Sequence, residues 1–225
     1  MIARAQSLRK SWLWLAVNVG AAVPLLWTLW DFRRGELIDP INAFTGRSGQ
    51  AAILLLLLSL AITPLVTLTG YRPLIGVRKS LGLWAFAYAI LHLYVFVGLD
   101  YGFSLEYILK DGLAQKRYIL VGAAALLILL PLAITSTRGW MRRLGRNWKQ
   151  LHKWVYAAGI LAVLHYIWVV KIAVGRPVVY ALVLALLLIA RIVPVRRVLA
   201  STGRRLRKQA PPRPKLERSA VAVKP

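Results

Sequence analysis

The stretch NWKQLHKWVYAAGILAVLHYIWVVK spans residues 147–171 and decides which kind of fold the chain can adopt. Between Lys153 and Lys171 it holds 17 consecutive residues without a formal charge, mostly aliphatic and aromatic. A helix needs roughly 20 apolar residues to cross the hydrocarbon of a bilayer. One histidine, His165, nevertheless lies inside the run, and another, His152, stands at its entrance. The stretch therefore predicts a membrane-spanning helix that carries titratable groups.

Similar apolar segments recur along the 225-residue chain, of which 59% is hydrophobic and only 17% is charged. A soluble domain of this length normally carries more charge. We expect an all-α membrane protein in which six transmembrane helices form one bundle, because the connecting loops are short. The last span reaches an adequate length if the long side chain of Arg191 extends to the interface. The predicted spans cover residues 11–30, 48–71, 80–99, 118–137, 152–170 and 177–194.

The first of these spans is expected to be retained in the mature protein. Its apolar stretch is too long for a cleavable signal peptide, it continues through Pro24, and no small-residue cleavage site follows it.

Basic residues are distributed unevenly over the loops. With the N-terminus inside, the four inner segments hold three, three, six and eleven of the Lys and Arg residues, which makes 23 of 31. Six of the seven acidic residues fall on the outer loops. The positive-inside rule therefore predicts that both termini are cytoplasmic. It also explains the net charge of +24 without nucleic-acid binding.

The six-helix domain is expected to occupy residues 1–198, and residues 199–225 a disordered, basic cytoplasmic tail, because that segment has little apolar content and several prolines. Two predicted helices contain a proline near their cytoplasmic ends, Pro64 and Pro131, each followed by threonines. We expect the threonine hydroxyls to satisfy the carbonyls that these prolines free.

The chain has three histidines, and His92 is the third. His92 lies 13 residues after Lys79, and His165 lies 12 residues after Lys153, at the starts of two helices that run outward. At 1.5 Å per residue, both imidazoles lie roughly 18–20 Å from the inner boundary. Two level histidines on separate helices are suited to be the axial ligands of one b-type haem. A helix–helix hydrogen bond or a proton relay is the alternative for each residue.

His152 lies near the cytoplasmic interface, about 20 Å from His165 along the helix. Thirteen residues turn an ideal helix so that the two side chains face different ways. Two haems with two histidines each would need four histidines, so the count supports one such haem. A second haem could bind only with a non-histidine ligand, by sharing a ligand, or not at all. His152 is a possible second or shared ligand, and a plain interfacial role for it stays open.

Several kinds of chemistry have no residues to support them. The chain has no cysteine, which excludes disulfides, thiolate metal sites, iron–sulfur clusters and covalent haem attachment. It has no paired carboxylates, no phosphate-binding glycine loop and no catalytic serine set. We therefore expect a protein that conducts electrons, a subunit of an oxidoreductase complex and not its catalytic subunit; whether it is an enzyme in its own right stays uncertain.

Five stretches resemble one known family: DPINAFTGRSG (39–49), RKSLGLWAFAYAILHLYVF (78–96), AITSTRG (133–139), LGRNWKQLHKWVYAAGILAVLHYIWVVK (144–171) and RPVVYALVLALLLIARI (176–192). The chain up to about residue 198 is similar to the haem-binding membrane subunits called MsrQ, formerly YedZ, of the bacterial protein-methionine-sulfoxide reductase system. The resemblance implies a ferric-reductase-like transmembrane domain in the inner membrane, related to the membrane part of eukaryotic NADPH oxidases. Such oxidases hold two haems between a histidine pair on each of two helices. Here Arg78 stands where the fourth histidine would fall, so it stays open whether an inner haem binds.

The resemblance also implies partners and a second cofactor. Electrons would come from the respiratory quinone pool or from a flavin donor. They would pass to a periplasmic molybdopterin subunit that reduces methionine sulfoxide in oxidised envelope proteins. The family is described as binding FMN, for which the sequence shows no motif; Arg142 and Arg143 are weak candidates for its phosphate, and the FMN residues stay unassigned. We expect the outer loops with Asp31, Glu36 and Asp39 to dock the partner.

Two other functions remain as alternatives. A stand-alone ferric or superoxide-type transmembrane reductase would use the same haem but would normally need a fused nicotinamide domain, for which the chain is expected to be too short. A non-redox membrane scaffold or transporter would explain the topology but not the level histidines.

Overall fold

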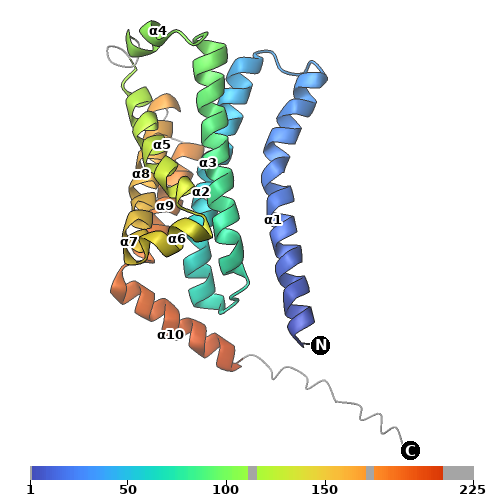
Figure 1. The fold of residues 1–225 in the computed structure, drawn as a ribbon, viewed down its shortest axis with the longest axis vertical. Coiled ribbons are helices and arrows are strands. Elements are labelled where there is room, and N and C mark those ends of the chain that lie inside the picture. Colours follow the sequence, from blue (N-terminus) through green and yellow to red (C-terminus); the bar gives the residue numbers. More distant parts are fainter. Residues whose placement is uncertain (1, 111–115, 171–174, 210–225) are drawn as a thin grey trace, which may run out of the picture.

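A computed structural model describes residues 2–110, 116–170 and 175–209, with side chains described from residue 12 to residue 205 within these ranges (Figure 1). The described residues form helices and turns and no strand, so the predicted all-α class is confirmed. The elements are α1 (Ile2–Arg33), α2 (Pro40–Thr69), α3 (Leu74–Tyr94) with a π-helical continuation η1 (Val95–Asp100), α4 (Leu105–Lys110), α5 (Tyr118–Ile134), α6 (Arg138–Leu144), α7 (Arg146–Leu151), a 3₁₀ turn η3 (His152–Trp154), α8 (Val155–Val170), α9 (Arg176–Ile189) and α10 (Val193–Gln209).

Four of these helical segments are long and apolar enough to cross a membrane unbroken: Trp12–Arg33, Pro40–Thr69, Leu74–Asp100 and Arg146–Val170. Two more spans are present if each of two bent helix pairs is counted as one. Helix α5 turns by 95° into α6, and α9 turns by 84° into α10. The chain is therefore a multi-pass membrane protein with four to six spans. The spans expected over 118–137 and 177–194 stop earlier, at Ile134 and Ile189.

The bundle has two ends, which we name after the short elements that lie there (Figure 1). The α4 end carries α4 and the loop between α1 and α2. The α10 end carries α10, the start of α1 and the turn between α2 and α3. Helices α2, α5 and α9 run from the α4 end towards the α10 end, and α3 and α8 return.

Helix α2 begins and ends at residues that favour these boundaries. Asp39 is the N-cap, and its carboxylate accepts a hydrogen bond from the Asn42 N–H at 3.0 Å. Pro40 occupies the first turn, where a missing N–H has no consequence. Gly70 ends the helix with a φ of 71°, a left-handed conformation that glycine adopts without strain. The α1–α2 loop is therefore fixed by a cap.

Four helices form the central square of the bundle. Helix α2 packs along α3, and α5 packs along α8; the two hairpins then meet through α3 with α5 and through α2 with α8. Helices α3 and α8 are therefore diagonal to each other. The core lies mainly on α2, with Leu60 exposed by only 1%, and Ala85 and Ala158 let the neighbouring helices approach closely.

Helix α1 is joined to the central square by Tyr88 of α3, which binds the backbone of α1 next to Pro24. The Tyr88 hydroxyl donates to the Ala21 carbonyl at 2.7 Å and accepts from the Leu25 N–H at 3.1 Å. It thus lies between two backbone groups that would normally bond to each other, one residue from Pro24. Trp84 adds a hydrogen bond from its indole N–H to the Asn18 amide oxygen at 2.8 Å.

The carbonyl that Pro64 frees has a different partner from the expected one. Pro64 has no N–H, so in α2 the carbonyl of Leu60 loses its helical donor. The guanidinium of Arg191 donates to this carbonyl at 2.6 Å and to the Tyr156 hydroxyl at 3.0 Å. The Thr67 hydroxyl instead bonds the Thr63 carbonyl. The expectation that Arg191 extends to the interface is therefore wrong, because the freed carbonyl inside the bundle binds it.

Helix α10 replaces part of the expected tail. Residues 199–209, which we expected to be disordered, are helical, and α10 crosses the end of α2 (Figure 1). A Cβ on Gly203 would collide with the Leu68 carbonyl and lie 2.7 Å from the Thr67 carbonyl oxygen, so glycine permits this close crossing. The segment 210–225 lies outside the described residues.

Replacing Arg191 should destabilise the bundle in a way that depends on Pro64. Arg191→Met leaves the buried Leu60 carbonyl without a donor, and we expect a loss of about 1.5–3 kcal/mol in the free energy of unfolding. In a Pro64→Ala background the alanine N–H can bond to that carbonyl, so the same substitution should cost about 1 kcal/mol less. Unfolding of the purified protein in detergent measures both values.

The matched control is Arg196→Met, which removes an exposed arginine of α10 and should leave stability nearly unchanged. Equal costs of Arg191→Met in the two backgrounds would contradict the role assigned to the freed carbonyl.

Candidate functional site

His92 lies on the last turn of α3 and points towards α2. Its Nδ1 is 2.8 Å from the carbonyl oxygen of Thr45, in the first turns of α2. The side chain is half-buried. The ring is therefore held by the backbone of a neighbouring helix.

His165 repeats this arrangement in the other hairpin. It lies on α8, and its Nδ1 is 2.7 Å from the carbonyl oxygen of Tyr118, the first residue of α5. In both cases the histidine follows its acceptor by 47 residues. The Tyr118 ring also packs on the imidazole, with ring centres 5.9 Å apart.

The two hydrogen bonds decide which nitrogen of each ring carries the proton. A carbonyl oxygen can only accept, so Nδ1 must be the donor in a neutral imidazole. Nε2 then carries a lone pair, which is the form that binds a metal. Neither the Nε2 of His92 nor that of His165 makes a hydrogen bond within the described part of the chain.

The structure brings the two imidazoles together at the centre of the square. Their ring centres are 6.1 Å apart, and the ring planes cross at 82°. A metal lies about 2 Å from an imidazole nitrogen, so two rings that ligate one ion from opposite sides have centres roughly 6 Å apart. The pair therefore has a separation, a nitrogen type and a tautomer with which the two rings could hold one metal ion.

Each of these histidines packs against a glycine that the sequence did not single out. A Cβ on Gly49 of α2 would lie 3.1 Å from the Nδ1 of His92, and a Cβ on Gly122 of α5 would lie 2.8 Å from the Nδ1 of His165. Each glycine comes four residues after the carbonyl that binds the ring.

The two hairpins are an internal repeat with an offset of 73 residues. This offset relates Thr45 to Tyr118 and Gly49 to Gly122, and also His92 to His165. The buried alanines Ala85 and Ala158 obey it as well. The signal is present in the sequence as A-I-L-H (89–92) and A-V-L-H (162–165), and comparing the chain with itself would have found it.

His152 lies apart from this pair, towards the α10 end. It occupies η3, and its ring stacks on Trp148 with centres 4.0 Å apart. Its Nδ1 is 3.1 Å from the Trp148 carbonyl oxygen. Its Nε2 is buried and makes no hydrogen bond of acceptable geometry, although the Leu132 carbonyl lies near the ring.

Two arginines lie near His152 and form with it what we call the inner cation cluster: His152, Arg78 and Arg191. The positive charge of Arg78 lies near both other members, and its Nη1 donates to the Thr63 hydroxyl at 3.4 Å. The Nε of Arg191 is buried and, like His152 Nε2, has no hydrogen-bond partner. The ion pairs between described residues, Arg34–Glu36 and Arg47–Asp31, are elsewhere, at the α4 end. The cluster thus combines positive charge with two unused donor or acceptor atoms.

Arg142 and Arg143, the weak candidates for binding an FMN phosphate, are less suited to bind an anion than the inner cation cluster is. Arg142 and Arg143 are exposed on α6, and the Arg143 guanidinium lies over the Trp140 ring at 5.5 Å. They have the environment of interfacial residues.

Two of the three acids expected to dock a partner also have structural roles. Asp31 is buried and forms an ion pair with Arg47 at 2.5 Å, which ties α1 to α2. Asp39 caps α2. Glu36 is exposed and pairs with Arg34. Of the three acids, Glu36 and Asp39 are exposed and only Asp31 is buried.

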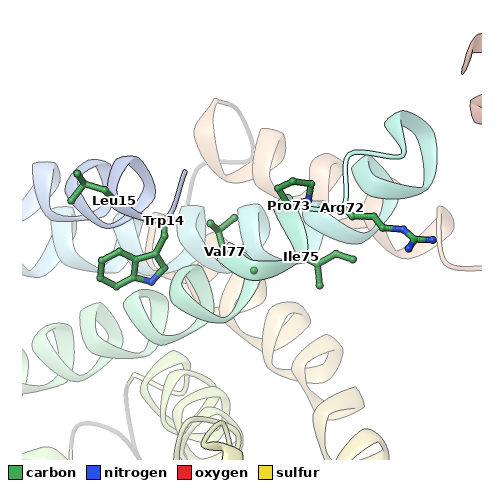
Figure 2. Close-up of a pocket in the computed structure, with 7 residues that line it drawn as sticks. Trp14, Leu15, Arg72, Pro73, Ile75 and Val77 are labelled. Atoms are coloured by element: carbon green, nitrogen blue, oxygen red, sulfur yellow. The ribbon is translucent and has the colours of Figure 1, made fainter. Parts of the chain in front are cut away.

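An open groove of about 830 Å³ lies between α1 and the start of α3 (Figure 2). Its lining residues include Trp14, Arg72, Ile75 and Val77. Val77 precedes His92 by 15 residues, which is about 22 Å along a helix. The groove is therefore separate from the paired histidines.

The fold and the paired histidines together define a transmembrane helical bundle of the ferric-reductase-like class. The sequence profile of the family described as ferric reductase like transmembrane component matches residues 48–163. This match contains the first histidine of the pair, both glycines and His152.

Curated relatives specify the family further. A protein of Rhodospirillum rubrum is 45% identical over 185 residues, which cover 81% of this chain and 88% of the relative. One of Xanthomonas oryzae pv. oryzae is 44% identical over 204 residues, 87% of this chain and 91% of the relative. Both are named the haem-binding subunit MsrQ of protein-methionine-sulfoxide reductase. The chain belongs to this MsrQ family.

Proposed function

We propose that the chain is a b-type cytochrome subunit of the bacterial inner membrane. It passes electrons from the quinone pool, or from a flavin donor, to a periplasmic molybdopterin methionine sulfoxide reductase. The observation that carries the proposal is the pair of neighbouring imidazoles, His92 and His165, with ring centres 6.1 Å apart in a bundle of apolar helices. The relatives' names support the haem and the methionine sulfoxide reductase system.

The chain's own residues supply three things to such a centre. His92 and His165 offer Nε2 lone pairs from diagonal helices. The Thr45 and Tyr118 carbonyls hold the rings and increase the basicity of the ligand nitrogens. Gly49 and Gly122 leave the space beside each ring that lets it reach its carbonyl. When bound, a b-type haem supplies a one-electron carrier.

The sidedness of the bundle follows from its charges. Most basic residues lie on the segments of the α10 end, so this end is proposed to be cytoplasmic, with both termini. The histidine pair is then nearer the periplasm, because it belongs to the half of the bundle at the α4 end (Figure 1). This placement suits electron exit to a periplasmic partner at the α4 end, where Glu36 is exposed.

The inner cation cluster is the part of the described chain best suited to an FMN phosphate. Arg78 and Arg191 supply positive charge, and a phosphate is a strong acceptor for guanidinium N–H groups. No acid of the described residues neutralises the cluster, and two of its nitrogens are unused. The same feature weakens the case for a second bis-histidine haem, because the described residue that brings charge near His152 is an arginine and the other two histidines lie at the α4 end.

Two alternative functions are compatible with the same histidine pair. A stand-alone ferric or superoxide-type reductase would have the same histidine pair but deliver electrons to a small acceptor. A non-redox scaffold would use the imidazoles only as hydrogen-bond donors to the carbonyls of α2 and α5.

Substituting the histidines one at a time tests the ligand assignment. With haem-replete expression we expect about one haem per chain in the wild type and almost none in His92→Ala or His165→Ala, because each loses an axial ligand. His152→Ala should keep the haem and serves as the control. Reduced-minus-oxidised spectra with pyridine-haemochrome quantitation give the values.

Full haem content in His165→Ala would exclude the assignment, and a colourless wild type would favour the scaffold. Proteoliposomes with a reduced quinol and the purified molybdopterin reductase then separate the two redox functions. We expect sulfoxide turnover that His165→Ala abolishes, and little reduction of ferric chelates or oxygen.

Flavin retention tests the inner cation cluster. Arg78→Gln should lower the FMN retained per purified chain about tenfold, since a charge-assisted hydrogen bond contributes roughly 1.5–3 kcal/mol. Arg143→Gln, an exposed interfacial control, should retain the wild-type amount. Fluorescence of released flavin measures it, and equal losses in the two variants would place the phosphate elsewhere.

A further inference from the structure

We propose that Gly49 and Gly122 are positioning residues that fix the tautomer and the ring plane of His92 and His165. The inference rests on the proposed function, because its importance lies in preparing two metal ligands. The effect of the two glycines on the histidine tautomers and hydrogen bonds can be tested in the protein without haem.

Each glycine and the carbonyl that binds the ring belong to the same helical turn. In an α-helix the carbonyl of residue i accepts the N–H of residue i+4. Gly49 is therefore the helical partner of the Thr45 carbonyl, and Gly122 is the partner of the Tyr118 carbonyl. A carbonyl oxygen has two lone pairs, so the second can accept the imidazole N–H. The ring reaches it because residue i+4 has no side chain.

The distances show how little room a methyl group would have. A Cβ on Gly49 would lie 3.1 Å from Nδ1 and 3.2 Å from Cε1 of His92. A Cβ on Gly122 would lie 2.8 Å from Nδ1 and 2.9 Å from Cε1 of His165. Alanine would thus push each ring away from the carbonyl that orients it. The tighter contact at Gly122 predicts the larger effect there.

Other described glycines on these helices do not share this feature. Gly46, one turn before Gly49 on α2, has nothing within 4 Å of a Cβ position. Gly82 would make only an ordinary contact with Ser59, at 3.6 Å. General helix packing therefore does not account for the two glycines that face an imidazole, and their occurrence in both halves of the repeat supports a shared role.

The consequence for a bound metal follows from the hydrogen bonds. A ring that donates through Nδ1 has a more basic Nε2 and a fixed plane. The two planes cross at 82° because α2 holds one ring and α5 the other. Releasing either ring should weaken metal binding, let that plane rotate and make the ligand a poorer electron donor, which favours the ferrous state.

The test uses the full chain in lipid vesicles, with ¹⁵N-labelled histidine and without haem. With three histidines in the chain, the signals can be assigned by His→Gln variants. Nitrogen NMR should show His92 and His165 protonated and hydrogen-bonded at Nδ1. Gly49→Ala should disturb the His92 signal alone, Gly122→Ala the His165 signal alone, and the control Gly46→Ala neither.

The haem-loaded variants add a second measurement. We expect haem affinity to fall about 10–100-fold in Gly122→Ala, the usual effect of losing a group that orients a ligand, and less in Gly49→Ala. The midpoint potential should rise, and the electron paramagnetic resonance signal should lose the strong anisotropy that crossed ring planes give. Gly46→Ala should match the wild type in all three.

The outcomes separate this inference from the proposed function. Unchanged Nδ1 signals in both glycine variants, or Nε2-protonated histidines in the wild type, would overturn the positioning role even if haem binds through both histidines. A wild type that binds no haem would refute the proposed function, while the nitrogen signals would still decide the role of the glycines. If Gly122→Ala failed to fold, Gly49→Ala, whose added Cβ would be less crowded, would decide the role.

Discussion

Backbone carbonyls are the acceptors through which the helices of this bundle hold one another. In a bilayer a polar side chain has no water to bond with, and the carbonyls of a helix are already used by their own N–H groups. A carbonyl becomes available to another helix where a proline removes its donor, where a glycine exposes its second lone pair, or where a side chain inserts between the carbonyl and its helical N–H. The donors and acceptors are Tyr88 with Ala21, Arg191 with Leu60, His92 with Thr45, and His165 with Tyr118. The packing of the central helices and the orientation of the paired imidazoles depend on these bonds.

The same bonds explain why histidines are tolerated in such an apolar interior. A neutral imidazole whose N–H is satisfied leaves only one unprotonated nitrogen to account for, and a metal ion accepts that lone pair. The bundle therefore combines structural stability with a site that is ready for a ligand. His152 has a local carbonyl partner and a stacked tryptophan but no facing histidine, so its half of the bundle is organised around positive charge.

The internal repeat explains why His92 and His165 have equivalent surroundings. Two hairpins related by 73 residues each contribute one acceptor, one glycine and one histidine, and they meet so that the histidines are diagonal. The halves differ at the α10 end, where Arg78 and His152 lie near each other instead of four histidines forming two pairs. The two hairpins are therefore alike around the paired histidines and different at the α10 end.

The sequence by itself determined the membrane-spanning helical class, the approximate spans and the level histidines, because these depend on local hydropathy and on the fixed rise of a helix. It placed His92 and His165 at one depth, but it could not show that their rings face each other. It also assigned Arg191 to the interface and Asp31 to a docking surface, whereas Arg191 is bound by a carbonyl 131 residues away and buried Asp31 forms an ion pair with Arg47 of the next helix. Only the tertiary structure decided the roles of Gly49, Gly122 and the Leu60 carbonyl. The physical reason is that a freed or exposed carbonyl can be identified from one helix, but the side chain that reaches it belongs to another.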